Sequence, residues 1–202
     1  MKYFLCLLPL FCVACVPVIE PKIAPVIEPI IGVSMKLNEA AYLQADAKDT
    51  RIKVSLSDQK AWLLDSDGTV LLETDISSGI DGRETPTGTY SVKERIIEKH
   101  SNRYGRLVDK ETGDVIVPKA WEHKGPIPKN LKYVGIEMPY WMRLTWSGIG
   151  MHVGGFALKE RSSFGCIRVY EKAQPYIYHK TSIGTKVELV EKSLVDEMAS
   201  TP

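Results

Sequence analysis

Alternation of apolar and polar residues predicts β-structure for most of the chain between residues 51 and 190. Ile52, Val54 and Leu56 alternate with polar neighbours, as in a half-buried strand. The apolar runs 61–64 and 69–72 flank an Asp-Gly pair ending at Gly68, which predicts a hairpin because glycine accepts a positive φ at no steric cost. Further strands are expected at 89–92, 133–136, 148–152 and 185–190.

The pattern changes outside these runs. Residues 35–50 follow a helical period roughly, with Ser34 as a candidate cap, and predict a short helical lead-in. A second helix is expected within 171–180, ending at Gly184, and Pro175 requires it to start late or to kink. Residues 191–202 are expected to be a frayed tail.

A long irregular insertion is expected between Lys99 and Lys132, because charges, glycines and prolines interrupt every periodic pattern there. One hairpin is predicted within it, around Val115–Val117. An insertion of this length in a compact domain is commonly a lid or a binding loop. A variable surface excursion is the alternative, and the sequence does not decide between them.

The N-terminus predicts export and anchoring. Met1-Lys2 and a short apolar run are typical of a signal peptide, because the run is too short to span a bilayer as a helix. Residues 12–15 read Cys-Val-Ala-Cys, which resembles a bacterial lipobox with Cys15 as the lipidated residue; a plain secretory signal is the alternative. Residues 16–34 repeat Pro-Val-Ile-Glu-Pro and predict an extended tether. We therefore expect a signal peptide over 1–15 and a periplasmic lipoprotein, anchored to the outer membrane.

The charge distribution bears on one class of partner, nucleic acid. The chain carries 26 Lys and Arg against 25 Asp and Glu, a formal net charge of +1, and the basic residues form no stripe. This distribution argues against a nucleic-acid partner.

One stretch carries the candidate chemistry. His152 and Cys166 lie 14 residues apart, joined by a segment that contains Gly154, Gly155 and Gly165. Cys166 is the only cysteine in the predicted domain, so it has no disulfide partner there. An imidazole that takes the thiol proton creates a nucleophile for acyl transfer, and small residues beside the sulfur leave backbone N–H groups for an oxyanion.

Non-catalytic roles for these residues are also consistent with the sequence. A lone cysteine is usually an inert small apolar residue, and a lone histidine is more often structural than catalytic. Arg168 suits a substrate carboxylate but could simply pair with Glu171. Zinc is disfavoured, because one cysteine and scattered histidines do not form a ligand set.

Three motifs carry a resemblance to a known family. They are the runs 138–143 (Met-Pro-Tyr-Trp-Met-Arg), 148–152 (Gly-Ile-Gly-Met-His) and 163–168 (Ser-Phe-Gly-Cys-Ile-Arg). Together with Thr-Pro-Thr-Gly at 85–88 and Ile-Gly-Thr-Lys-Val at 183–187, they resemble the L,D-transpeptidase (YkuD) family in collinear order over residues 51–190.

The resemblance implies a mostly β fold, a β-sandwich with a catalytic cleft and one or two short helices. It implies that a cysteine attacks the L-centred third residue of a peptidoglycan stem tetrapeptide, expels D-alanine and passes the acyl group to an amine. By position, the roles fall on Cys166 as nucleophile and His152 as base. The oxyanion and substrate-binding roles fall on Gly165, Arg168, Ser163, Tyr140 and Gly154. No metal or organic cofactor is implied. Two adjacent aromatics at Tyr140 and Trp141 are equally consistent with core packing.

Phe164 departs from the family pattern, because the family has a second histidine there. A phenyl ring makes no hydrogen bond beside the sulfur, and apolar surroundings raise a thiol pKa. Val153, where a small residue is common, is a milder departure. We expect a weakened or respecialised transpeptidase. The alternatives are an L,D-carboxypeptidase that uses water, transfer to an envelope-protein lysine, and a peptidoglycan-binding module without turnover.

Overall fold

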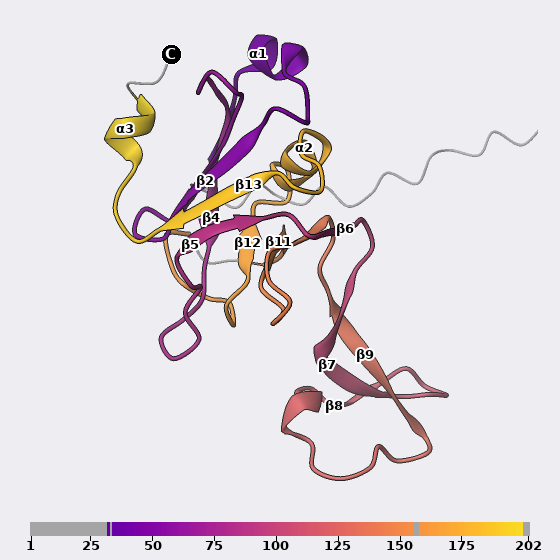
Figure 1. Cartoon of the computed structure of the whole chain (residues 1–202). Helices are drawn as coiled ribbons and strands as arrows, with labels where there is room; N and C mark the ends of the chain where they lie inside the picture. Colours follow the sequence, from indigo (N-terminus) through magenta and orange to yellow (C-terminus); the bar gives the residue numbers. More distant parts are fainter. Residues whose placement is uncertain (1–31, 33, 156–157, 200–202) are drawn as a thin grey trace, which may run out of the picture. The chain divides into compact units, whose positions relative to one another are not determined.

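The structure of the protein is a computed structural model that describes residue 32 and residues 34–155 and 158–199 (Figure 1). The predicted signal peptide at 1–15, the lipidation site Cys15 and nearly all of the tether at 16–34 lie outside these residues. No helix within the described ranges is long and apolar enough to cross a membrane.

One half of the main sheet is built from the strands that the alternating pattern predicts. β2 (Arg51–Ser55), β3 (Lys60–Leu64) and β4 (Val70–Ser77) pair antiparallel in chain order. The hairpin between β3 and β4 is confirmed, with Gly68 at φ +99°. The closing strand β13 (Lys186–Val190) runs parallel to β2 and carries β5 (Gly88–Ser91) on its far side.

The other half carries the candidate chemistry. β12 (Ile167–Val169) pairs antiparallel with β4 and parallel with β11 (Gly150–Val153). β10 (Trp141–Arg143) and β6 (Glu94–Ile96) follow antiparallel, which gives the order β5-β13-β2-β3-β4-β12-β11-β10-β6. The expectation of a mostly β domain is confirmed.

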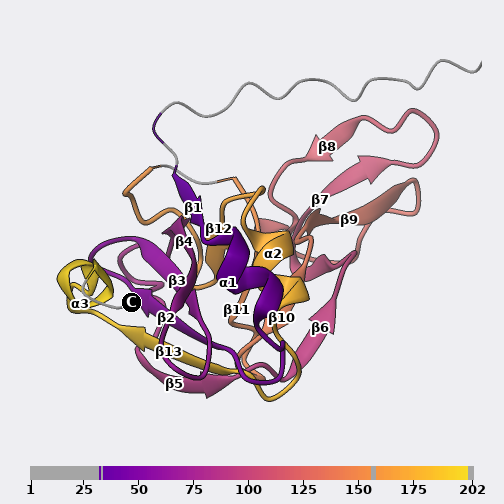
Figure 2. The ribbon, with the colours of Figure 1, turned by 90° about the horizontal axis from the view of Figure 1, so that it is seen from above.

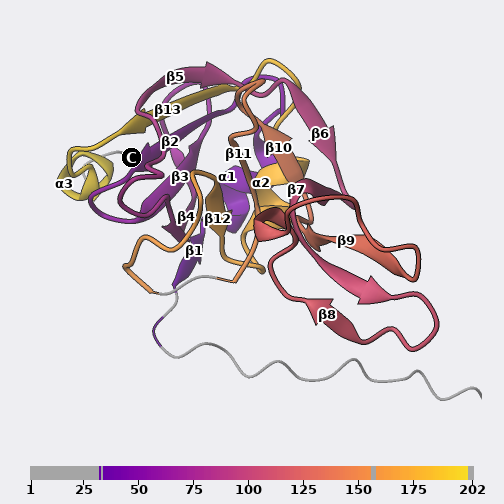
Figure 3. The ribbon, with the colours of Figure 1, turned by 90° about the horizontal axis from the view of Figure 1, so that it is seen from below.

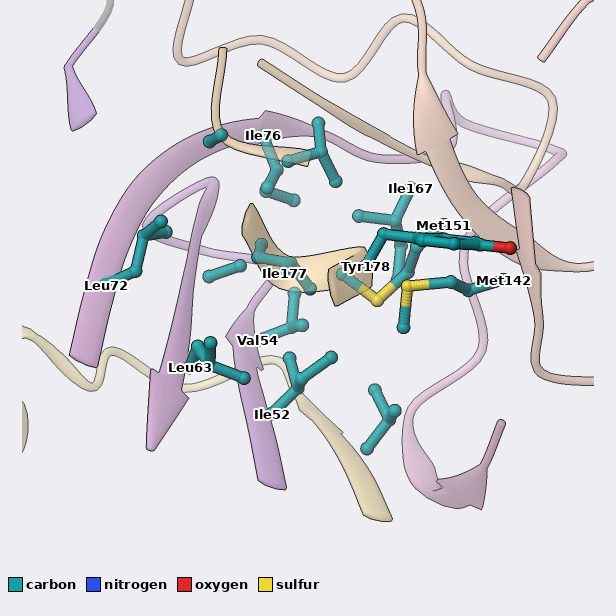
Figure 4. Close-up of a cluster of buried hydrophobic side chains, with 14 of the residues drawn as sticks. Ile52, Val54, Leu63, Leu72, Ile76, Met142, Met151, Ile167, Ile177 and Tyr178 are labelled. Atoms are coloured by element: carbon teal, nitrogen blue, oxygen red, sulfur yellow. The ribbon is translucent and has the colours of Figure 1, made fainter. Parts of the chain in front are cut away.

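The main core lies between the two halves of this curved sheet. Figure 4 shows side chains from β2, β3 and β4 facing side chains from β10, β11 and β12, with α2 (Gln174–His179) among them. Ile177 of α2 is fully buried there. Burying an aliphatic side chain of this size stabilises the fold by about 1.5–3 kcal/mol. The packed core therefore holds β11 and β12 in place relative to β4.

The two predicted helical segments are helical over shorter ranges. Residues 35–50 contain a strand, β1 (Met35–Leu37), which pairs with β4, and then α1 (Glu39–Gln44). Asn38 caps α1 rather than Ser34, since its side chain accepts from the Ala41 N–H at 3.2 Å. α2 starts late, with Pro175 in its first turn, and ends at His179 with Lys180 as its C-cap, rather than at Gly184. α1 lies beside α2 through the ring contact of Tyr42 and Tyr176 at 5.4 Å (Figure 2).

The insertion is far more regular than the sequence predicts. β7 (His100–Asp109), β8 (Val115–Val117) and β9 (Leu131–Glu137) form a separate three-stranded sheet, β8-β7-β9, and η1 (Ala120–Glu122) follows β8. Figure 3 shows this sheet beside the β10 and β11 end of the main sheet. The prediction of an irregular segment was wrong because these strands are only partly buried, so their polar residues do not alternate strictly.

The predicted frayed tail also differs from the structure. α3 (Val195–Ala199) buries Met198, and Leu194 just before it is 3% exposed. Both side chains pack against Trp62 and Leu64 on the face of β3 away from the main core. The end of the chain therefore covers a second, smaller core.

Candidate active site

The parallel pairing of β11 with β12 brings His152 and Cys166 to one cleft. His152 stands opposite Arg168 in the register of the two strands, and Cys166 directly precedes β12. All three side chains line a cleft with a volume of about 440 Å³. A separation of 14 residues in sequence is thus closed by two adjacent parallel strands.

The tautomer of His152 follows from its backbone contact. Its Nδ1 lies 2.7 Å from the carbonyl oxygen of Val153. A carbonyl only accepts, so Nδ1 carries the proton and Nε2 is left as the basic nitrogen. The imidazole is 5% exposed and lies against Trp141, with ring centroids 5.8 Å apart. Burial, and next the positive charge of Arg168, outweigh the hydrogen bond to Val153 and lower the pKa of His152 to about 4.

Cys166 is the free cysteine of the described residues and is partly buried. Its thiol donates to the carbonyl of Gly148 at 3.6 Å. Burial raises the pKa of the thiol, although the Gly150 N–H and the charges of Arg168 and Arg143 act in the opposite direction. Both shifts favour the neutral thiol and the neutral imidazole over the ion pair.

The loop before Cys166 is held by hydrogen bonds of Ser163, which involve two residues with predicted roles. Ser163 is 1% exposed; its hydroxyl donates to the Cys166 carbonyl and accepts from the Gly165 N–H at 3.2 Å. The Gly165 N–H was expected to face an oxyanion, and this bond occupies it. Ser163 binds its own loop and also borders the cleft, and its expected role in substrate binding stays a prediction.

Thr85 is a positioning residue whose role the sequence reasoning missed. Its hydroxyl donates to the Gly165 carbonyl and accepts from the Gly79 N–H, each at 2.9 Å, and the side chain is 3% exposed. Gly165 itself has φ +107°, and a Cβ there would lie 2.8 Å from Ile149. The Thr-Pro-Thr-Gly element at 85–88 was the available signal, since it had matched the family pattern without a role of its own.

Arg168 and Gly154 lie together on the His152 side of the cleft. Arg168 donates to the Gly155 carbonyl at 2.9 Å and lies 3.4 Å from the Ser162 hydroxyl. Among the described residues it forms no ion pair with Glu171. A Cβ at position 154 would lie 3.0 Å from the Arg168 side chain and 3.3 Å from the His152 ring, so glycine lets the two side chains sit side by side.

Tyr140 does not line the cleft. Its ring packs edge-on against Tyr178 at 5.5 Å and near His179, and its carbonyl accepts from Gln174. The positive φ of +55° at Tyr140 turns the chain into β10 with the ring on the α2 side. The ring therefore packs as the core-packing alternative describes, and substrate binding by Tyr140 stays a prediction.

Phe164 faces the insertion. Its ring centroid lies 5.2 Å from that of Tyr104 on β7 and 6.2 Å from that of Trp121 in η1. The guanidinium of Arg83 lies 4.8 Å from the Phe164 centroid and donates to the Tyr104 hydroxyl at 2.9 Å. Tyr104, Trp121 and Phe164 all border the cleft beside Cys166. The sequence pointed to Phe164 only as a departure from a pattern.

Fold and site together define a mostly β domain in which a buried imidazole and a thiol share one cleft. The L,D-transpeptidase catalytic domain (YkuD) family model matches residues 49–189, so the chain belongs to this family. A comparison with curated proteins gives no match.

Solved structures agree on the fold. An L,D-transpeptidase from Mycobacterium tuberculosis H37Rv aligns with a TM-score of 0.52 at 18% identity, over 71% of this chain and 58% of that one. One from Mycobacterium smegmatis gives 0.51 at 16%, over 70% and 58%. LdtMt1 in complex with imipenem gives 0.51 at 21%, over 71% and 59%. The chain thus spans less than two thirds of the length of each of these relatives.

Proposed function

We propose that this protein is a cysteine-dependent L,D-transpeptidase that acts on peptidoglycan stem tetrapeptides through a thioester on Cys166. The observation that carries the proposal is the shared cleft of Cys166 and His152, in which the proton on Nδ1 leaves Nε2 free to act as a base. Membership of the family supports the acyl-transfer chemistry and the peptidoglycan substrate.

The first half-reaction forms the thioester. His152 Nε2 takes the thiol proton as Cys166 Sγ attacks the carbonyl of the third stem residue. The tetrahedral intermediate collapses, the bond to D-alanine breaks, and the imidazolium returns the proton to the leaving amine. Since the resting pair is neutral, proton transfer accompanies substrate binding and attack rather than preceding them.

The second half-reaction passes the acyl group on. An acceptor amine attacks the thioester, loses a proton to His152 and releases Cys166 as the thiol. The acceptor is the side-chain amine of a neighbouring stem; water in its place gives L,D-carboxypeptidase activity, and a lysine of an envelope protein gives attachment. Arg168 stands beside the reacting atoms with a positive charge, which favours the thiolate and suits a substrate carboxylate.

A non-catalytic peptidoglycan-binding module is the second candidate. It is favoured by Phe164 in place of the family histidine and by the raised pKa of Cys166. In both cases we propose that the protein works in the periplasm, held to the outer membrane by a lipid on Cys15. Labelled palmitate should enter the wild type and be absent from Cys15→Ala.

Two measurements test the main proposal. Full-length protein is incubated with purified disaccharide-tetrapeptide, and the products are separated by liquid chromatography with mass spectrometry; cross-linked dimer and free D-alanine are expected, and Cys166→Ala should form neither. Imipenem should add covalently to Cys166 in the wild type and not in Cys166→Ala. Unchanged tetrapeptide together with no adduct would instead favour the binding module.

A further inference from the structure

The contacts of Phe164 indicate a role for this side chain that differs from the role of the histidine found at this position in the family. The ring is 39% exposed, yet it meets two aromatic side chains from the insertion and one guanidinium from the loop after β4. Offset and edge-on ring pairs at these distances are attractive beyond the area that they bury. A histidine at this position would be smaller and polar, and would lose part of that contact.

These contacts also join two parts of the domain. Within the described residues, the hydrogen bonds and ring contacts between insertion side chains and the rest of the domain all involve Arg83 or Phe164. The chain also enters the insertion from β6 into β7 and leaves it from β9 into β10. Phe164, two residues before Cys166 in the chain, thus contacts both Tyr104 and Trp121 beside the sulfur.

The other residues that line the cleft show what the side chains of Phe164, Tyr104 and Trp121 face. Tyr104, Trp121, Phe164, Ile136 and Met138 present apolar surface to the cleft. His152 and Arg168 border the same cleft close to the sulfur, while Lys119 and Glu137 stand at its exposed side. A ligand that reaches the thiol must therefore lay an apolar stretch along the aromatic side while its reacting carbonyl lies at Cys166.

We propose that Phe164 fixes Tyr104 and Trp121 as an aromatic wall that binds the aliphatic part of the acyl donor next to the scissile bond. Phe164 is thus a positioning residue for donor binding, not the remnant of a lost proton-transfer group. This inference rests on the proposed function, because the donor is taken to be a stem tetrapeptide.

Binding without turnover tests the wall directly. Cys166→Ala protein is titrated with purified disaccharide-tetrapeptide by calorimetry, alone and combined with Trp121→Ala or Phe164→Ala. Each second substitution should weaken binding about tenfold, the effect of losing a well-placed aromatic contact. Both together should weaken it less than the product of the two effects, because each ring holds the other. Trp146→Ala, which removes an exposed tryptophan that does not line the cleft, is the matched control and should bind within about threefold of the parent.

Thiol reactivity separates this role from the catalytic one. Alkylation of Cys166 by iodoacetamide should show the same pH profile in wild type, Phe164→Ala and Trp121→Ala. Phe164→His should bind the tetrapeptide more weakly without alkylating faster. Unweakened binding in Trp121→Ala, no measurable binding in the Cys166→Ala parent, or a Phe164→His protein that alkylates faster and binds as well would overturn the proposal. Weakened binding in a protein that never cross-links would support the wall while refuting the proposed transpeptidase activity.

Discussion

Replacing His152 with asparagine should remove a large part of the acid sensitivity of this fold. The imidazole has a pKa of about 4 when folded and near 6.5 when unfolded. Protons therefore bind the unfolded chain more readily. The stability that this group contributes is present above pH 6.5 and is lost as the pH falls towards 4. The full loss amounts to about 3 kcal/mol, of which about 2 kcal/mol is reached by pH 5.

Asparagine is the informative replacement because its amide N–H can still donate to the Val153 carbonyl, whereas it does not titrate. Urea unfolding of wild type and His152→Asn, followed by tryptophan fluorescence at pH 7, 5 and 4, measures the effect. Between pH 7 and pH 4 the wild type should lose about 3 kcal/mol more than the variant. His100→Asn, which removes an exposed imidazole, is the matched control and should follow the wild type.

Equal pH slopes for wild type and His152→Asn would refute the reasoning. They would mean that His152 is solvated or paired when protonated. The resting site could then be an ion pair, in which proton transfer precedes attack.

Two further predictions concern the supports of the site and of the fold. Thr85→Val leaves the Gly79 N–H and the Gly165 carbonyl without their partner, so it should cost about 2–4 kcal/mol in urea unfolding and slow imipenem addition to Cys166. The exposed Thr87→Val should cost less than about 0.5 kcal/mol, and equal effects at the two positions would contradict the role given to Thr85. Leu194→Ala should cost about 2–3 kcal/mol by the same assay, because the side chain is buried against the outer face of β3. A loss no larger than that of the exposed Leu43→Ala would show that the end of the chain does not stabilise the domain.

The elements that were predicted correctly are those whose conformation depends mainly on their own residues. The hairpin at Gly68 follows from one residue that tolerates positive φ, and the closing strand follows from the alternation of polar and apolar residues over 186–189. The late start of α2 was predicted correctly from Pro175. The shared cleft of His152 and Cys166 was also predictable, because a strand, a glycine-containing loop and a second strand bring such residues together.

Features that depend on distant partners could not be predicted in this way. Leu194 and Met198 lie in a largely polar stretch of sequence, and their burial depends on Trp62, which is distant in the chain. The ring of Tyr140 turned towards α2 because of a backbone conformation that sequence does not reveal for a tyrosine. The Gly165 N–H looked free for an oxyanion, and only the loop geometry directs it to Ser163. The wall at Tyr104 and Trp121 requires knowing that the insertion folds back beside Cys166.

The pairing of β11 with β12 has a consequence for how this enzyme family can vary. The register of two hydrogen-bonded strands sets the height of His152 relative to Cys166, and the residues that link the strands do not. The described part of the linking segment is anchored separately, since the Ser77 hydroxyl on β4 donates to the Glu160 carbonyl. Grafting a foreign peptide ahead of that anchor should therefore leave the relative positions of His152 and Cys166 unchanged.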